Sequence, residues 1–335
     1  MKQITIKEIA QKTGYSVNTV SRALANRGEI SKETAAKICK VAESLGYVPN
    51  LLARGLAGRR SNTIGFIMGD MLNPFHWPVV KVIQEELNDR GLNLVMANSR
   101  ETPDGLRTAV NIMQSNQVDG LLMFFTDGGE ESLRVLHSRN IPTVLIGTRS
   151  DAVPTSYVEC NDVLGGYLAA MHLIQRGCRR IAFVGKKQHT VPSDSRLEGY
   201  CQALQKKGYE IDPDLLISAP PNLEGGYISA GNVDFLNCGI DGIVAYNDLL
   251  AIGIIRNLLE RGIRIPEQVA IVGYDNITFG EYCYPPLTTV NIPKEQMGRK
   301  AVELIIELIE HKLNDEPDEL HLELLNPKLI VRQTA

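Results

Sequence analysis

The sequence lacks the features of a membrane protein or a disulfide-rich secreted protein. None of its 335 residues belongs to an uncharged apolar run of about eighteen or more, so no membrane-spanning helix is expected. The N-terminus, MKQITIKEIAQK, has no apolar segment typical of a secretion signal, which favours a cytoplasmic protein. The six cysteines are scattered without a CxxC pair, so we expect reduced, buried thiols.

The sequence also lacks the common signatures of enzymes. It has no GxxxxGK[ST] phosphate loop, no GxSxG elbow, no HExxH helix, and no GxGxxG opening a helix after the first core strand. The six histidines are dispersed, and none has an evident nucleophile near it in the sequence. We therefore expect a protein that is not an enzyme and that uses no cofactor and no metal.

Charge is unevenly distributed along the chain. The first sixty residues contain eleven Lys and Arg against four Glu, a net charge of +7, whereas the whole chain carries −4. The remainder is therefore at −11. A small basic segment on an acidic body indicates a polyanionic partner for that segment alone.

The first fifty residues predict three short helices. Thr5 and Glu8 form a capping-box pattern, and apolar residues at helical spacing follow until Gly14 ends the helix. Ser16 can cap a second helix, and Ser31 begins a third. Two short helices joined by a tight turn are typical of a helix-turn-helix, in which the second helix enters the major groove of DNA.

The second helix contains side chains suited to reading bases. Asn18 and Arg22 can form paired hydrogen bonds with adenine and guanine, and Val17 can contact a thymine methyl group. Hydroxyls and backbone amides at helix starts suit phosphates. The candidate DNA contacts here are Thr5, Ser16, Val17, Asn18, Thr19, Ser21, Arg22 and Ser31. A three-helix interaction domain with a polar outer face is the alternative.

From residue 62 onward, short apolar runs alternate with longer amphipathic stretches. This alternation predicts parallel sheets built from right-handed βαβ units. The number of strands, and a restart of the pattern near residue 160, indicate two similar lobes. The runs expected to form strands are 63–68, 92–97, 119–125, 143–147, 181–185, 215–219, 242–248 and 269–275.

Several stretches match the pattern of a known family. The most specific are TIKEIAQKTGYSVNTVSRALAN at 5–26 and ETAAKICKVAESLGYVPNLLARGLAGRRSNTIGFI at 33–67. Weaker motifs are NPF (73–75), VDGLL (118–122), AYND (245–248), VGYDN (272–276) and PPLTTV (285–290). Together they cover essentially the whole chain, which resembles the lactose-repressor/galactose-repressor (LacI/GalR) family of bacterial transcription regulators.

The resemblance implies an all-α helix-turn-helix domain at 1–49, a hinge helix at 50–61 and an effector-binding core at 62–335. The core would consist of two doubly wound parallel-sheet lobes, as in periplasmic sugar-binding proteins. The expected N-lobe is about 62–160 and 291–320, and the C-lobe about 161–290 and 321–335. Crossings between lobes are then expected near 160–161, 290–291 and 320–323.

The resemblance also implies a function. Family members are mostly repressors that bind palindromic operator DNA as homodimers and respond to a small effector, often a sugar. Their hinge helices pair on DNA, and each inserts a leucine into the minor groove; the matching residue is Leu56, with Ala53 at the close approach and Asn50 nearby. An apolar wedge of this kind can unstack a base step and bend DNA.

Effector contacts are expected at strand ends facing the space between the lobes. Asp275 resembles the family carboxylate for ligand hydroxyls, and Arg196 the family arginine that binds ligand oxygens. Asn247 resembles a ligand-facing residue, whereas we expect Asp248 to cap the following helix. The full set of candidates is Phe75, His76, Thr126, Arg149, Arg196, Asn247 and Asp275.

One departure from the family pattern concerns the effector. Many relatives have an aromatic residue before the helix that starts near 223, whereas this chain has Pro220 and Pro221. The aromatic wall of the C-lobe is therefore missing or supplied from elsewhere. The first alternative to a sugar-controlled repressor is a catabolite-type regulator controlled by a protein corepressor. A second, less favoured alternative is a sugar-binding protein or enzyme on the same scaffold.

Overall fold

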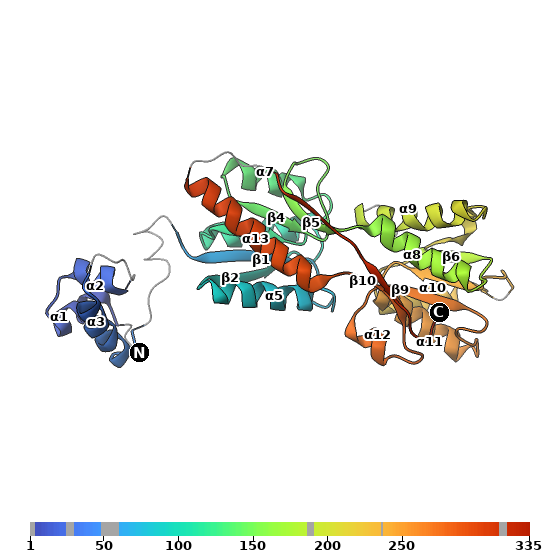
Figure 1. Ribbon diagram of the computed structural model, residues 1–335, viewed down its shortest axis with the longest axis horizontal. Coiled ribbons are helices and arrows are strands. Elements are labelled where there is room, and N and C mark those ends of the chain that lie inside the picture. The colour runs from blue at the N-terminus through green and yellow to red at the C-terminus, as the bar shows by residue number, and fades with distance from the viewer. Residues whose placement is uncertain (1–3, 25–29, 48–59, 186–190, 236, 315–319) are drawn as a thin grey trace. The chain divides into compact units, whose positions relative to one another are not determined.

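The computed structural model describes residues 4–24, 30–47, 60–185, 191–235, 237–314 and 320–335 (Figure 1). By its internal contacts the chain divides into two units, Met1–Thr63 and Ile64–Ala335. Among its described residues the first unit has helices and, at Thr63, the start of a strand, and the second unit contains two six-stranded sheets. None of the helices in the described ranges is both long enough and apolar enough to cross a membrane.

The first unit has the three helices that its sequence predicts. They are α1 (Ile6–Thr13), α2 (Val17–Leu24) and α3 (Lys32–Ser44). Thr5 and Glu8 complete the capping box at the start of α1, and Gly14 ends that helix in the left-handed conformation at φ 74°. Ile9, Val20 and Ile38, one from each helix, are fully buried together. This small core fixes α2 against its neighbours and leaves its outer face exposed.

The N-lobe of the second unit is built on a sheet with strand order β11-β5-β4-β3-β1-β2. Its strands are β1 (Thr63–Met68), β2 (Asn93–Asn98), β3 (Gly120–Met123), β4 (Thr143–Ile146), β5 (Ser156–Cys160) and β11 (Leu322–Leu325). Its helices are α5 (His76–Asp89), α6 (Pro103–Ser115), α7 (Glu130–Ser138) and α13 (Lys294–Leu313). The pairs from β11 through β5, β4 and β3 to β1 are all parallel.

The C-lobe is built on a second sheet, with strand order β12-β10-β9-β8-β6-β7. Its strands are β6 (Ile181–Gly185), β7 (Leu216–Ser218), β8 (Gly242–Ala245), β9 (Ala270–Asp275), β10 (Thr288–Asn291) and β12 (Lys328–Ile330), the last antiparallel to β10. Its helices are α8 (Asp162–Gln175), α9 (Val191–Lys206), α10 (Leu223–Gly231), α11 (Asp248–Glu260) and α12 (Thr278–Tyr282), with a 3-10 turn at Pro213–Leu215. The predicted fold class, a helix-turn-helix unit plus two parallel-sheet lobes, is confirmed.

The chain passes between the two sheets three times. The first crossing joins β5 to α8 at 160–162, and the second joins β10 to α13 at 291–294. The third was expected near 320–323, but it lies between Leu325 and Lys328, because β11 still pairs with β5 of the N-lobe. The expected N-lobe boundary at residue 320 is therefore too early. The apolar run at 322–325 completes the N-lobe sheet before the chain crosses.

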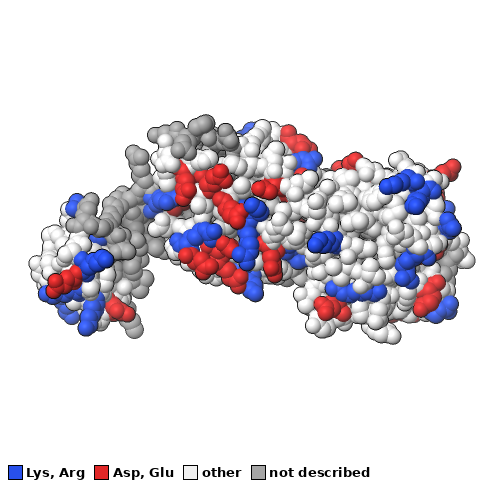
Figure 2. All heavy atoms as spheres, viewed as in Figure 1, with Lys and Arg blue, Asp and Glu red and all other residues white. Residues whose placement is uncertain are grey.

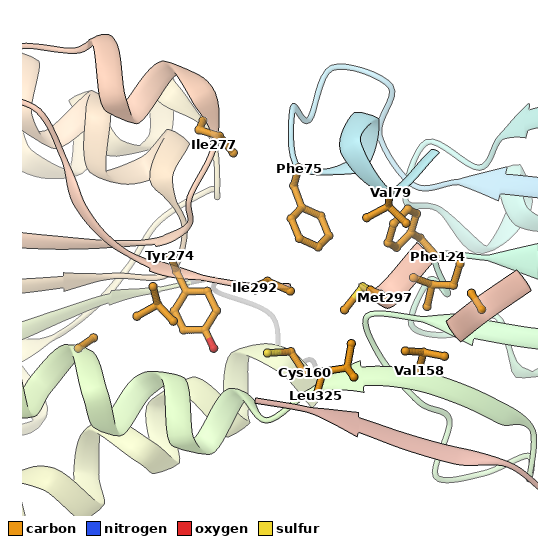
Figure 3. Packing of buried hydrophobic residues seen from close by; sticks show 14 of the residues in the cluster. Phe75, Val79, Phe124, Val158, Cys160, Tyr274, Ile277, Ile292, Met297 and Leu325 are labelled. Carbon is orange, nitrogen blue, oxygen red and sulfur yellow. The ribbon is translucent and has the colours of Figure 1, made fainter. Parts of the chain in front are cut away.

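Buried side chains continue from one lobe into the other at these crossings. Figure 3 shows Tyr274 and Ile277 on the C-lobe side and Phe75, Val79 and Phe124 on the N-lobe side, with Cys160, Ile292, Met297 and Leu325 between them. All of these residues belong to one hydrophobic cluster. The cleft between the lobes therefore has a packed apolar base.

The outer surfaces of the two lobes differ in charge. On the face shown in Figure 2, acidic and basic side chains lie close together over the N-lobe, whereas most of the C-lobe is uncharged. Glu86 of α5 forms two ion pairs, each at 2.6 Å. One is with Arg90 at the end of the same helix, and the other is with Arg299 of α13. These exposed ion pairs contribute little to stability individually.

Candidate functional site: a DNA-reading helix and an inter-lobe cavity

The candidate base-reading side chains lie on the outer face of α2. Asn18 and Arg22 are exposed and four residues apart, so they share one helix face, and Ser21 is half-buried beside them. Val17 fits the apolar spacing of the helix, yet 46% of its surface is exposed. The packed residues of α2 are instead Val20 and Ala23. An exposed valine next to an asparagine and an arginine is consistent with contact to base edges.

The hydroxyl candidates lie at helix starts. The Ser16 hydroxyl accepts a hydrogen bond from the Thr19 amide at 3.0 Å and lies 2.8 Å from the Thr19 hydroxyl. Ser31 accepts in the same way from the Thr34 amide at 3.3 Å, and Thr5 accepts from Glu8. The predicted caps at Ser16 and Ser31 are therefore confirmed. The hinge candidates Asn50, Ala53 and Leu56 lie outside the described residues.

A cavity of about 170 Å³ lies between the lobes, at the carboxyl ends of both sheets. Six of the seven candidate effector residues line it: Phe75, His76, Thr126, Arg196, Asn247 and Asp275. They come from five different segments of the chain and meet only because the two parallel sheets present the same ends to each other. Arg149 is not among the lining residues.

Arg149 has another environment. Its guanidinium pairs with Glu159 at 2.8 Å and with Asp151 at 3.1 Å. Burial by itself lowers the pKa of Arg149, but these two carboxylates outweigh it and raise the pKa above its ordinary value. Its guanidinium is occupied by the neighbouring strand and loop, so nothing in this arrangement directs it to the cavity.

Arg196 is the centre of the C-lobe wall. Its Nε lies 3.3 Å from Asp162 and its Nη2 3.7 Å from Asp275, while its Nη1 donates to the Tyr246 carbonyl oxygen at 2.6 Å. The guanidinium carbon lies 3.8 Å from the ring centre of Tyr274 and 4.6 Å from that of Tyr246. The whole side chain is 6% exposed, so this buried charge is stabilised by two carboxylates and two aromatic rings.

Close packing of two helices places Arg196 there. A Cβ added at Gly166 of α8 would lie 2.0 Å from the Arg196 carbonyl oxygen, and one at Gly199 of α9 would lie 1.9 Å from that of Val163. Only glycine allows this approach of backbone to backbone. The two glycines therefore bring Arg196 of α9 within reach of Asp162 at the start of α8.

Burial controls the protonation of the carboxylates in this wall. It raises the pKa of Asp275 to about 6, although Arg196 and Lys294 act in the opposite direction. Burial likewise raises the pKa of Asp162 against the effects of Arg196 and Tyr274, whose hydroxyl donates to it at 2.7 Å. Burial by itself lowers the pKa of Arg196, but its anionic neighbours outweigh that and raise it. Arg196 is thus permanently charged.

The backbone at Asp275 is strained. Asp275 has φ 107° and Asn276 has φ 51°, values that side-chain-bearing residues adopt rarely. Lys294, at the start of α13, donates to the carbonyl oxygens of both residues. A lysine from the N-lobe side thus holds the turn that aims Asp275 into the cavity.

The capping role expected of Asp248 is corrected by the structure, whereas Asn247 lines the cavity as expected. Asn247, not Asp248, caps α11, because its side-chain oxygen accepts from the Leu250 amide at 2.9 Å and its Nδ2 donates to the Pro221 carbonyl oxygen. Asp248 is fully buried and accepts from Thr289 at 2.5 Å and from the Ile277 amide at 2.8 Å. Burial, followed by the charge of Asp275, raises the pKa of Asp248 to about 8.

The N-lobe wall is mainly aromatic, and its acidic residues are Glu101 and Asp127. Phe75 points into the space between the lobes (Figure 3), and its ring centre lies 6.0 Å from that of Phe124. His76 stacks on Phe124 with ring centres 4.2 Å apart. The Thr126 hydroxyl lies 3.1 Å from that of Ser99. The rings and hydroxyls in these contacts belong to residues that are at most 9% exposed, so packing fixes their positions.

Sequence reasoning missed several lining residues. Asp162 and Cys160 follow or end β5, a strand that was not predicted because SYVEC mixes polar and apolar residues. Glu101 and Tyr246 also line the cavity. Tyr246 places an aromatic ring on the C-lobe wall, which Pro220 and Pro221 do not provide. Their position in the sequence could have identified them, because each of these residues ends a strand, follows one, or lies in the loop beyond one.

Comparison with known proteins agrees with this architecture. The family description "Bacterial regulatory proteins, lacI family" matches residues 5–50, and "Periplasmic binding protein-like domain" matches residues 170–335. The HTH-type transcriptional regulator DegA of Bacillus subtilis is 33% identical over 297 residues, which are 88% of this chain and 88% of DegA.

Two solved structures are also similar. The transcriptional regulator CelR in complex with cellobiose has a TM-score of 0.74 and 29% identity, covering 99% of this chain and 100% of CelR. A LacI-family regulator from Enterococcus faecium with bound ribose has a TM-score of 0.72 and 28% identity, covering 81% and 98%. These relatives are transcriptional regulators and not enzymes. The chain therefore belongs to the LacI family of bacterial regulatory proteins, with a DNA-binding helix-turn-helix and an effector-binding domain.

Proposed function

We propose that this chain is a dimeric repressor that binds a palindromic operator and whose DNA affinity is controlled by a small sugar-like molecule between its lobes. The observation that carries the proposal is the cavity, which brings buried polar groups and aromatic rings from both lobes around one space. The relatives solved with cellobiose and with ribose support a sugar-like ligand.

The effector acts through the arrangement of the lobes. A ligand shifts an equilibrium only by its different affinity for the two states, so it must bind one lobe arrangement more tightly than the other. Lys294 of α13, on the N-lobe, donates hydrogen bonds to the C-lobe turn at Asp275. A ligand bound by Asp275 would therefore act next to a contact that joins the two lobes. Effector affinity and operator affinity are then reciprocally coupled.

On the DNA side, we propose that Asn18 and Arg22 read bases while Ser16, Thr19 and Ser31 lie near phosphates. Dimerisation follows from the symmetry of a palindrome, since each half-site takes one helix-turn-helix. We further propose that Leu56 is the minor-groove wedge, with Ala53 where two hinge segments approach and Asn50 at their start. A short hinge helix is unstable alone and needs partner and DNA to form.

The DNA proposal is tested by selecting binding sites from random duplex DNA with the full chain, followed by anisotropy titrations. The selected sites should be palindromic. Arg22→Ala should weaken binding by about 1–3 kcal/mol and relax preference at one base position of each half-site. Arg107→Ala, an exposed substitution on α6, serves as the matched control. Unaltered discrimination by Arg22→Ala would refute its role.

The wedge is tested separately by DNA bending. Leu56→Ala should reduce operator bending measured by energy transfer between end-labelled fluorophores, and should lower operator affinity. Effector binding in the core should be nearly unchanged. Wild-type bending by this variant would exclude Leu56 as the wedge.

Effector control is tested by adding sugars to the complex of protein and selected operator. A cognate sugar should change operator affinity, and operator should change sugar affinity by the same factor. A sugar that binds the protein without altering operator affinity would contradict the proposed control.

A further inference from the structure

The ring of His76 presents a hydrogen-bond acceptor to the cavity. Its Nδ1 lies 2.8 Å from the carbonyl oxygen of Asp70, and because a carbonyl only accepts, Nδ1 bears the proton. Burial lowers the pKa of His76 to about 4, so the imidazole is neutral near pH 7 and Nε2 has a free lone pair. His76 is 5% exposed, and no described residue donates to Nε2.

Aromatic neighbours pack against the same ring. Phe124 stacks against His76 at 4.2 Å and 27°, and Phe75 meets it edge to face at 5.7 Å. A ligand cannot use the stacked face of His76 as an apolar platform. What His76 offers a ligand is therefore the Nε2 edge of its ring.

Glu101 lies beside His76 across Gly69. A Cβ added at Gly69 would be 3.4 Å from Glu101 Oε1 and 3.7 Å from His76 Cε1, so the two side chains flank one glycine that lines the cavity. Glu101 has φ 52° and its amide donates to the Gly69 carbonyl oxygen at 3.2 Å. No ion pair or hydrogen bond joins its carboxylate to another described core residue. A strained backbone thus holds a second acceptor next to Nε2.

The charge of the opposite wall is already balanced. Arg196 is the only Lys or Arg among the described lining residues, and Asp162 and Asp275 both lie within 4 Å of it. Asp275 is 6% exposed, and its carboxylate accepts no hydrogen bond from the described residues. With Glu101 also lining the cavity, three carboxylates there face the single arginine.

We infer that His76 and Glu101 determine effector specificity by accepting hydrogen bonds, and that the effector is a neutral or amine-bearing sugar without phosphate or carboxylate. This inference rests on the proposed function of the cavity as an effector site. Hydroxyl and ammonium groups supply the donors that Nε2, Glu101 and Asp275 lack. A phosphate or carboxylate would bring further negative charge toward Glu101 and Asp275, and that group would offer no donor to the buried acceptors His76 Nε2 and Asp275.

The test uses the full chain and matched sugars in a thermal-shift screen. Each aldopentose, aldohexose and disaccharide is compared with its amino, phosphorylated and uronic acid forms. Only neutral or amino forms should raise the melting temperature, because a ligand that binds the folded state stabilises it. A stronger shift with the amino form identifies an ammonium contact. A shift with a phosphate or uronate, or no shift with any member, overturns the inference.

Variants then assign the contacts for the sugar that binds. His76→Leu should weaken it about tenfold or more by calorimetry, whereas His76→Gln, which retains an acceptor, should restore part of the affinity. Glu101→Gln should weaken an amino sugar more than its neutral form. Glu131→Gln on α7 is the matched surface control, and circular dichroism verifies folding.

Two outcomes separate this inference from the proposed function. Unchanged affinity in folded His76→Leu and Glu101→Gln refutes the specificity role even if the sugar still controls operator binding. A neutral sugar that depends on both residues but does not alter operator affinity leaves the inference standing and refutes the proposed control.

Discussion

The two walls of the cavity are built by different physical means although both belong to parallel sheets of the same kind. Most of the N-lobe wall consists of rings and hydroxyls held by packing, with His76 stacked on Phe124, although Glu101 also lines the cavity from this lobe. The C-lobe wall is an electrostatic cluster, in which Arg196 is balanced by Asp162 and Asp275. One wall depends on shape, and the other on charge balance in a buried place.

This difference predicts which wall should lose less stability when one of its residues is substituted. Packed rings lose stability gradually as atoms are removed. A buried charge cluster fails abruptly, because removing one partner leaves the others uncompensated. The C-lobe wall should therefore be the more fragile of the two and the more sensitive to pH.

The largest effect is expected for Arg196→Met. It leaves Asp162 and Asp275 buried without their cation, so the free energy of core unfolding should fall by about 3–5 kcal/mol. Urea unfolding followed by circular dichroism measures it. The control is Arg107→Met, whose ion pair with Asp104 is exposed on both sides (69% and 85%), so that its loss should cost less than about 1 kcal/mol. Equal losses for both would remove the contrast between a buried cluster and an exposed pair.

The second-largest effect is a pH dependence of the free energy of unfolding, which originates in the C-lobe. Asp248 keeps its proton up to a pKa of about 8 in the folded state, whereas the unfolded chain releases it near its ordinary value of 3.8. The folded state therefore binds more protons between these values, and stability falls as pH rises through that window, by at most about 1.4 kcal/mol per pH unit.

Unfolding free energies measured from pH 5 to 9 check this dependence. Asp248→Asn removes the titrating group and should flatten the profile between pH 6 and 8. A profile equally steep in this variant would assign the effect to other groups.

A smaller effect is expected in the N-lobe wall. Phe124→Leu loses the edge contact with Phe66 at 5.7 Å and the stack on His76, so it should destabilise the core by about 1–2 kcal/mol. Phe279→Leu, at a ring that is 62% exposed, should change stability little. Thermal denaturation compares the two. A loss as large as that of Arg196→Met would show that packing and charge balance contribute equally.

The smallest effect is expected for Thr126→Val. The hydroxyl lies 3.1 Å from Ser99, which also donates to the Met68 carbonyl oxygen, so Ser99 keeps a partner after the substitution. Stability should change by less than about 1 kcal/mol. A clear loss of ligand affinity with unchanged stability would place the Thr126 hydroxyl against the ligand.

Much of the fold follows from local sequence patterns. The strand at 63–68 and the caps at Thr5, Ser16 and Ser31 were predicted correctly, because apolar periodicity and capping chemistry act over a few residues. Strand β5 was missed because its composition is mixed. The third crossing was misplaced because the pairing of β11 with β5 joins segments far apart in the sequence.

The site was predictable in part. Strand-end position and the family resemblance together identified six residues that line the cavity, but Arg149 follows a strand as well and pairs with Glu159 instead. Asn247 lines the cavity and also caps α11, the role expected of Asp248, which is buried instead, since a one-residue step at a helix start decides which side chain caps and which is buried.

The sequence by itself determined the two kinds of unit, the basic helix-turn-helix and the acidic α/β core, because charge, periodicity and caps are properties of neighbouring residues. Only the tertiary structure decided which polar groups share the cavity. Glu101, Asp162 and Asp275 come from three distant parts of the chain. The protonation of Asp162 and Asp275 depends on burial and on Arg196, which α9 supplies only where glycines let it pack against α8. Such effects act through space, so no stretch of sequence contains them.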